Sequence, residues 1–211
     1  MKTQKKSKYA SVSLILVDSK KLYNHCKSFT DDVIITSDKH DSGTERIIEF
    51  LHTNEKYENI VNVQGDEPFL SSDLIDKIFL ELNNGERIVT YGFFSDKKSY
   101  QNSTNEVKIV LDKNSHAIYF SRSDIPYDRD SNSNNRKLIH MGLYGYKRSE
   151  LILFDSYNNN ILEKIERLEQ LRFIENNRKI KVLLTYDKTI GIDSIEDYNN
   201  AIKYYEARNN K

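Results

Sequence analysis

Cysteine, proline and tryptophan are scarce or missing in this sequence. Among 211 residues there are one cysteine, Cys26, two prolines and no tryptophan. One cysteine excludes a disulfide framework and a cysteine-rich metal cluster, and it is typical of proteins in a reducing cytoplasm. Two prolines and seven glycines also exclude a collagen-like chain and a linker rich in proline and glycine. We therefore expect a globular, cytoplasmic protein.

The sequence also lacks an excess of one charge and a long apolar run. Its 32 Lys and Arg residues balance 32 Asp and Glu residues, whereas proteins that bind nucleic acid through its phosphates usually carry a basic excess. No apolar run approaches the roughly 18 residues that cross a bilayer. The run Val12–Val17, which follows a basic N-terminus, is too short for a signal peptide. We expect neither a nucleic-acid partner nor a membrane.

Short apolar runs alternate with amphipathic segments in the first half of the chain. This alternation predicts an α/β fold with a mostly parallel sheet flanked by helices, and the length fits one domain over residues 1–211. Helices are expected to begin at Ser42, where Ser-Gly-Thr-Glu fits a capping box, and at Ser71 or Ser72. A polar helix is expected over 19–28, and runs rich in β-branched residues predict strands at 12–17, 32–36, 59–63 and 87–94.

The middle of the chain departs from this alternation. Three strand-type segments follow one another with no helix between them, at 106–111, 117–121 and 140–146. We expect them to form a small antiparallel insert over about 105–148. The polar composition of 128–137 predicts a mobile loop.

The last third returns to helices and one strand. The spacing of Ile161, Ile165, Leu168 and Leu171 predicts one helix over 161–176. A strand is expected at 180–184, and a final helix from Ser194 to Arg208.

Carboxylates stand where a sheet of this kind binds ligands, just beyond the carboxyl ends of its strands. Asp66 follows the strand 59–63 within Gln-Gly-Asp-Glu-Pro, and Mg²⁺ commonly takes one or two carboxylates together with substrate phosphates. An acidic turn explains the same residues. Asp193, before the last helix, fits either a second metal ligand or an acidic residue stabilised by the helix dipole.

The other candidate residues are equally open on sequence alone. His140, Tyr144 and Arg122 fit strand or surface positions, and Glu169 fits ion pairing along a helix face. The sequence has no Gly-x-Gly-x-x-Gly, no phosphate-binding P-loop motif, no nucleophile elbow and no His-Glu-x-x-His. Dehydrogenase, P-loop and zinc-hydrolase functions thus lose their usual support.

Several motifs occur together in one order, and in this order they resemble one enzyme family. They are Ser42-Gly-Thr-Glu-Arg46, Val61-Asn-Val-Gln-Gly-Asp-Glu-Pro68, Ala117-Ile-Tyr-Phe-Ser-Arg122 with Ile125-Pro-Tyr-Asp-Arg129, His140-Met-Gly-Leu-Tyr-Gly-Tyr146, Leu168-Glu-Gln-Leu-Arg172 and Gly191-Ile-Asp193. From residue 12 to residue 208 the chain closely resembles the 3-deoxy-D-manno-octulosonate (Kdo) cytidylyltransferases, the CMP-Kdo synthetases of lipopolysaccharide synthesis. The resemblance implies a Rossmann-like fold of the nucleotide-diphospho-sugar transferase type and a homodimer formed through the middle strands.

The resemblance also implies the reaction and the residues that carry it. The family transfers CMP from CTP to Kdo and releases pyrophosphate. By this resemblance Asp66 and Asp193 hold Mg²⁺, and Arg122 joins them in catalysis. Ser42, Gly43 and Arg46 lie near the cytidine, while the Kdo pocket is lined by Gln64, Arg122, His140, Tyr144, Glu169 and Gln170.

The N-terminal region departs from the family pattern. The family normally opens with a strand and a loop of the type Pro-Ala-Arg-x-x-Ser-x-Arg-Leu-Pro-Gly-Lys, whose Arg and Lys hold the triphosphate, and this sequence has no such loop. We therefore expect a domain that is N-terminally incomplete relative to the family. Two alternatives stay open, an inactive remnant or non-enzymatic module that binds a sugar acid, and a cytidylyltransferase for another sugar acid.

Overall fold

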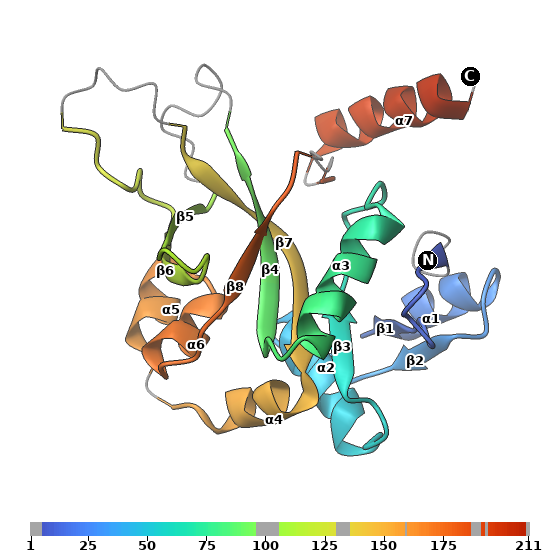
Figure 1. Ribbon diagram of the computed structural model, residues 1–211. Helices are drawn as coiled ribbons and strands as arrows, with labels where there is room; N and C mark the ends of the chain where they lie inside the picture. The colour runs from blue at the N-terminus through green and yellow to red at the C-terminus, as the bar shows by residue number, and fades with distance from the viewer. Residues whose placement is uncertain are drawn as a thin grey trace.

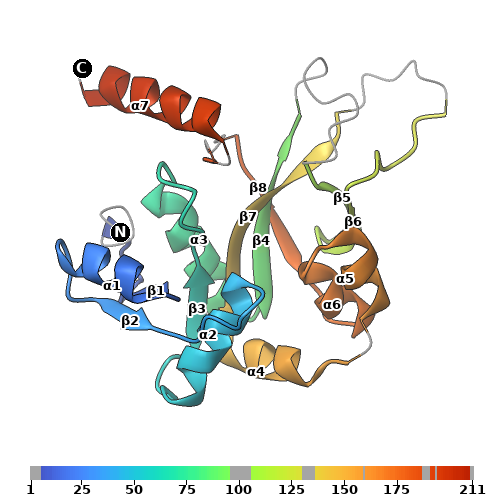
Figure 2. The ribbon, with the colours of Figure 1, turned by 180° about the vertical axis from the view of Figure 1, so that it is seen from behind.

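The computed structural model describes residues 6–95, 106–129, 136–158, 160–186, 191–192 and 194–209 (Figure 1). A six-stranded sheet lies at the centre, with helix α3 packed on one face and helices α2, α4 and α6 on the other. The opposite view in Figure 2 shows the same layers, with β1, β2 and α1 to one side of the main sheet. This layered arrangement confirms the predicted α/β fold.

Two sheets hold the strands of the described residues. β1 and β2 form a small parallel pair, and the main sheet has the order β6-β5-β7-β4-β8, with β3 also paired to β7. The bounds are β1 (Ile15–Val17), β2 (Val33–Ile35), β3 (Asn59–Asn62), β4 (Ile88–Phe94), β5 (Lys108–Leu111), β6 (Ala117–Ser121), β7 (Leu138–Lys147) and β8 (Lys181–Leu184).

Strand β7 differs from the expectation of a side insert, because it runs through the middle of the main sheet. It pairs antiparallel with β4 along one edge and with both β3 and β5 along the other. β3, β4, β5 and β8 therefore share one direction. For β3, β4 and β8 this agrees with the predicted mostly parallel sheet, whereas β5 was expected in the antiparallel insert. β7 pairs antiparallel with β3, β4 and β5. The ten residues of β7 are buried along most of their length, so the strand needs cover on both faces.

The predicted helix starts are confirmed. The side chains of Ser19, Ser42 and Ser71 each accept a backbone N–H of the first turn, which satisfies a donor that has no partner within the helix. The Ser42 cap differs slightly from a full capping box, because Glu45 accepts the N–H of Asp41 instead of that of Ser42. The described helices are α1 (Lys20–Lys27), α2 (Gly43–His52), α3 (Ser72–Asn83), α4 (Arg148–Ser156), α5 (Ile161–Glu166), α6 (Gln170–Glu175) and α7 (Ile195–Asn209).

The single helix expected over 161–176 is wrong, since two short helices occupy this segment. Arg167 has φ 53° and ends α5 in the left-handed region, and Leu168 donates its N–H back to the carbonyl of Glu163. Ile161 and Ile165, which were expected on the buried stripe, are 63% and 73% exposed. Only the second half of the stripe reaches the core.

The sequence pattern also missed α4, which follows β7 directly. Leu151 and Phe154 of α4 are fully buried. Glu150 is buried too, and it accepts two hydrogen bonds from Arg178 and lies 2.7 Å from Nε of Arg87. A buried carboxylate needs such partners, and these two guanidinium groups attach α4 to the core.

Helix α7 lies apart from the sheet in both ribbon views, with Ala201 buried and the Tyr204 ring 4.8 Å from the Phe69 ring. The part of the predicted mobile loop at 130–135 lies outside the described residues. None of the described helices is long and apolar enough to cross a membrane.

The two faces of β7 carry two different cores. Tyr144 and Tyr146 pack with α2, α4 and α6, while Met141 and Leu143 pack with α3. At Gly145 the strand comes so close to α3 that an added Cβ would lie 2.0 Å from Cγ2 of Ile78. The absence of a side chain at Gly145 thus permits the close packing of α3 on the sheet.

We predict that Gly145→Ala lowers the free energy of unfolding by about 1–3 kcal/mol, because Ile78 and α3 must shift to admit the methyl group. Urea denaturation measures the effect. The matched control is Gly65→Ala, where an added Cβ meets nothing within 4 Å. Equal stabilities of the two variants would contradict this account of the contact between α3 and β7.

Candidate active site

The candidate site lies where one edge of β7 changes its strand partner. β5 pairs with Leu138 and Ile139, and β3 pairs with Tyr144–Lys147. Between these two pairings, Met141 pairs with β4 alone, and Gly142 and Leu143 have no register partner among the described strands. The carboxyl end of β3 meets β7 here, which is the position at which α/β sheets commonly bind ligands.

A bulge in β7 brings two predicted site residues together. Tyr144 is opposite Thr90 of β4, but Met141 is opposite Tyr91, so Gly142 and Leu143 are extra residues on β7. Residues four apart in a regular strand are separated by about 13 Å. The bulge shortens this span, and the rings of His140 and Tyr144 are 5.1 Å apart between centroids. Bulges often turn side chains toward an active site in this way.

Tyr144 belongs to a row of aromatic rings. The Tyr144 ring stacks on Tyr146 at 5.5 Å, and Tyr146 contacts Phe173 of α6 at 5.8 Å. Phe173 in turn contacts Phe154 of α4 at 4.9 Å. The row fixes the wall of the site to two helices of the core.

The N-terminus of α2 lies over the end of β3. A Cβ added to Gly43 would be 3.7 Å from Nδ2 of Asn62 and 3.8 Å from the amide group of Gln64. The next residue, Thr44, is fully buried and donates a 2.7 Å hydrogen bond to Oε1 of Glu169. This bond ties α2 to the start of α6, and together with the short distances from Gly43 it brings Gly43, Gln64 and Glu169 close together.

Three buried polar atoms of this neighbourhood make no hydrogen bond of good geometry with a described residue, although the side chain of Thr90 lies near Tyr144 and that of Ser42 near Glu169. The three atoms are Nδ2 of Asn62, the hydroxyl oxygen of Tyr144 and Oε2 of Glu169. Buried polar atoms are nearly always paired, so unpaired ones near each other suggest that a polar ligand completes their bonding. One amide, one hydroxyl and one carboxyl suit the hydroxyl groups of a sugar.

Burial shifts the titration of these residues toward their neutral forms. It lowers the pKa of His140 to about 3 and raises the pKa of Tyr144 well above its ordinary value. Burial also raises the pKa of the Glu169 carboxyl, an effect that the hydrogen bond from Thr44 partly opposes. Gln170 is buried next to Glu169 at the start of α6.

Arg122 lies at the end of β6, where α5 holds its side chain. Its Nε donates to the carbonyl of Glu166 at 3.0 Å, and its backbone N–H donates to the Glu166 carboxylate at 3.0 Å. Ser121 donates to the same carboxylate at 2.6 Å. These bonds hold the backbone and Nε of Arg122 against Glu166. They do not test the predicted contact of Arg122 with a sugar carboxylate.

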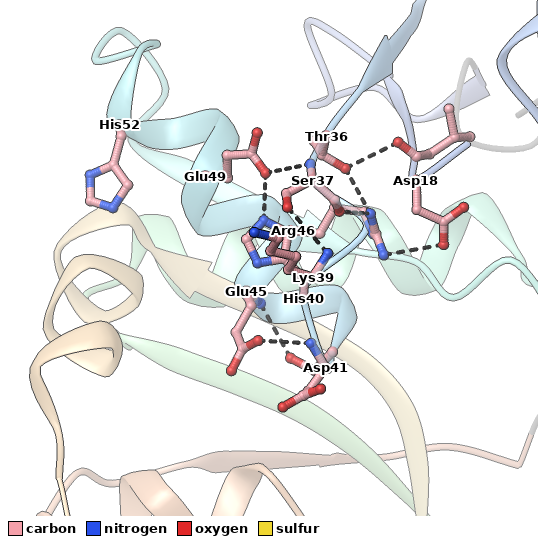
Figure 3. A network of polar contacts seen from close by, with 12 residues as sticks. Asp18, Thr36, Ser37, Lys39, His40, Asp41, Glu45, Arg46, Glu49 and His52 are labelled. Atoms are coloured by element: carbon pink, nitrogen blue, oxygen red, sulfur yellow. Dashed lines mark hydrogen bonds and ion pairs between the residues drawn. The ribbon is translucent and has the colours of Figure 1, made fainter. Parts of the chain in front are cut away.

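Arg46 takes part in a polar network between α2 and the loop before it (Figure 3). Its guanidinium donates to the hydroxyl of Thr36 at 2.8 Å and to the carbonyl of Ser37 at 3.0 Å. Glu49 accepts the N–H of Ser37 and pairs with His40, which follows in the same loop. The network holds the segment that leads to Ser42 in place. Arg46 therefore helps to position the start of α2 at the candidate site.

Asp66 is exposed beyond the end of β3. Its backbone carbonyl accepts the N–H of Ile192 at 3.0 Å, which brings 191–192 next to the end of β3. Asp193, the second predicted metal ligand, lies outside the described residues. The described residues contain no group of three or more His, Cys, Asp and Glu side chains that could hold a metal.

A cavity of about 820 Å³ extends from Ser42 and Glu169 outward between α2, α5 and α6. Its wall includes residues that the sequence did not single out as site residues, among them Tyr157, Lys164 and Arg167. Thr44 and Asn62 were also missed, although both stand inside motifs that were recognised. Adjacency within those motifs was the signal that could have found them.

Comparisons with known proteins give consistent results. The family model described as cytidylyltransferase matches residues 3–180. The 3-deoxy-manno-octulosonate cytidylyltransferase of Fusobacterium nucleatum is 39% identical over 212 residues, which cover 100% of this chain and 86% of the relative. The enzyme of the same name from Thermodesulfovibrio yellowstonii is 38% identical and covers 94% of this chain and 83% of its own.

Solved structures share the fold. A CMP:2-keto-3-deoxy-manno-octonic acid synthetase complexed with CTP matches with a TM-score of 0.89 at 24% identity, over 99% of this chain and 86% of that one. The 4-diphosphocytidyl-2C-methyl-D-erythritol synthase of Anaerococcus prevotii matches with a TM-score of 0.65 at 13% identity, over 97% and 83% of the two chains.

We predict that Glu169→Gln stabilises the protein at neutral pH and has little effect in acid. Because the pKa of Glu169 is raised in the folded state, its stabilising contribution is complete below the ordinary pKa of 4.5 and is lost as pH rises through the raised pKa. Glutamine avoids the cost of ionisation and still accepts the hydrogen bond from Thr44.

Thermal unfolding from about pH 4 to about pH 8 measures this difference, with the variant gaining in Tm as pH rises. Glu55→Gln, at an exposed position, is the matched control. A Tm difference that is the same at every pH would contradict the account.

Proposed function

Because the chain belongs to the cytidylyltransferase family, and its curated relatives are CMP-Kdo synthetases, we propose that it transfers CMP from CTP to Kdo. The products are CMP-Kdo and pyrophosphate. One structural observation carries the proposal most directly: unpaired buried atoms of Asn62, Tyr144 and Glu169 gather at the end of β3, where an α/β sheet binds its ligands.

The reaction needs positioning more than covalent help from the protein. The anomeric hydroxyl oxygen of Kdo attacks the α-phosphorus of CTP and forms a new P–O bond. The bond from that phosphorus to the β-phosphate oxygen breaks, pyrophosphate leaves with the electron pair, and the hydroxyl proton is released. Phosphoryl-transfer enzymes accelerate such steps mainly by alignment and by neutralising phosphate charge.

The sugar acid is assigned to the region where the end of β3, the bulge of β7 and the start of α6 come together. We assign Gln64, His140, Tyr144, Glu169 and Gln170 to its hydroxyl groups and Arg122 to its carboxylate, which a guanidinium group binds through two parallel hydrogen bonds. The raised pKa of Glu169 supports this assignment, since it favours the neutral form of the carboxyl group, which repels the carboxylate of the ligand less than the ionised form does. Ser42, Gly43 and Arg46 at the start of α2 are assigned to the nucleotide.

Asp66 and Asp193 are proposed to hold Mg²⁺. Support comes from the exposed carboxylate of Asp66 and from the hydrogen bond that brings Ile192 to its backbone. Two carboxylates plus phosphate oxygens match the coordination that Mg²⁺ prefers in proteins. When bound, the ion supplies positive charge to the α-phosphate.

Three further parts of the proposal concern the setting of the enzyme. A homodimer through the middle strands, a cytoplasmic location and a role in lipopolysaccharide synthesis are all expected from the resemblance. The relatives do not favour the two open alternatives, a non-enzymatic module and an enzyme for another sugar acid. These relatives carry the name 3-deoxy-manno-octulosonate cytidylyltransferase, and this chain covers 86%, 80% and 83% of their lengths.

We predict that Asp66→Asn reduces pyrophosphate release from CTP, Kdo and Mg²⁺ by about 100-fold or more, because the amide is a poor ligand for a hard cation. A coupled pyrophosphate assay with the full chain measures turnover. Asp155→Asn serves as control, since Asp155 lies on α4 with an exposed side chain. Full Mg²⁺-dependent turnover by Asp66→Asn would refute the metal assignment, and no turnover by the unmodified chain would refute the proposed function.

A further inference from the structure

The hydrogen bonds of Thr90 indicate which ring nitrogen of His140 carries the proton. The residue lies fully buried in β4, opposite the bulge of β7. Its hydroxyl oxygen is 2.9 Å from the carbonyl of Leu143, 3.2 Å from the carbonyl of Met141 and 3.0 Å from Nε2 of His140. The hydroxyl therefore has three hydrogen-bond partners of good geometry, and the Tyr144 side chain lies near it as a fourth polar group.

One tautomer of His140 satisfies more of these contacts than the other. A threonine hydroxyl has a single hydrogen to donate, and a carbonyl oxygen can only accept. The Thr90 hydrogen thus points to Leu143 or Met141, because otherwise neither contact is a hydrogen bond. Toward His140 the oxygen of Thr90 then acts as acceptor, so the proton must lie on Nε2 of the imidazole.

The opposite ring nitrogen of His140 is then an acceptor. Burial lowers the pKa of His140 to about 3, so at neutral pH the ring carries one proton, on Nε2. The ring packs edge-on against Phe120 at 5.3 Å and is tilted against Tyr144 at 5.1 Å, which restricts its rotation. No hydrogen bond joins Nδ1 to another described residue.

We propose that Thr90 is a positioning residue that holds His140 in the Nε2–H tautomer, so that Nδ1 accepts a hydrogen bond from a hydroxyl group of the substrate. The tautomer follows from this structure alone, whereas the substrate hydroxyl rests on the proposed function. His140 then selects a hydrogen-bond donor and remains uncharged. Thr90 touches neither sugar nor nucleotide, and acts through His140.

The tautomer is tested directly by long-range ¹H–¹⁵N correlation spectra of the histidine rings in ¹⁵N-labelled protein. The chain has five histidines, and His140→Gln assigns the signal of His140 by its loss. We expect one protonated nitrogen, Nε2, in the unmodified protein and in Thr90→Ser, which keeps the hydroxyl. Thr90→Val keeps the shape without the hydroxyl, and we expect a shift toward the other tautomer.

A proton on Nδ1 in the unmodified protein would overturn the proposal without any variant. Identical His140 signals in Thr90→Ser and in a folded Thr90→Val would also overturn it. The first result needs no substitution, so the test survives if Thr90→Val does not fold.

Steady-state kinetics tests the consequence for the substrate. Because one hydrogen bond to Kdo weakens, Thr90→Val should raise KM for Kdo by about five- to tenfold and leave KM for CTP unchanged. Thr90→Ser should restore the KM for Kdo. Equal rises in both KM values would overturn the positioning role, since general loosening of the core would affect both substrates.

The proposed function and the role of Thr90 can be refuted independently. If the unmodified chain releases no pyrophosphate, the proposed function is refuted, and the ring spectra still decide whether Thr90 sets the tautomer. If turnover is normal but His140 has the other tautomer, the proposed function stands and the role of Thr90 is refuted.

Discussion

The candidate site depends on the bulge where β7 crosses Thr90 of β4. Two extra residues on β7 release backbone carbonyls from the regular ladder, and the buried hydroxyl of Thr90 gives one of them a donor. Without the bulge, His140 and Tyr144 would lie about 13 Å apart along the strand. With it, their rings are neighbours beside the end of β3. The geometry of the site is therefore a consequence of strand pairing in the sheet.

Local sequence signals predicted the elements that depend on local physics. Ser19, Ser42 and Ser71 all cap helices, and β6 has the bounds that its apolar run predicted, because capping and alternation act within a few residues. The break at Arg167 was not predictable from periodicity, since Ile161 and Ile165 continue the helical spacing although they end up in solvent. There, packing against the core decided which half of the stripe was used.

The motifs selected residues that the structure places near one another, but they did not indicate the contacts between them. Gln64, Glu169 and His140 come from three elements, and their neighbourhood follows from the resemblance and from the rule for strand ends. The bond from Thr44 to Glu169 and the role of Thr90 needed the structure, because both join residues at least 50 positions apart in sequence. Composition carries no information about such pairs. Asp193 stays a prediction.

The row of aromatic rings behind Tyr144 links the wall of the candidate site to the hydrophobic core. Tyr144, Tyr146, Phe173 and Phe154 contact one another in succession, and the last two belong to α6 and α4. Close-packed interiors transmit small displacements, because few voids are present to absorb them. A smaller side chain at Phe154 would thus relax the position of Tyr144 three rings away. In evolution, changes that soften this core would therefore move the wall of the candidate site as well as lower the stability of the fold.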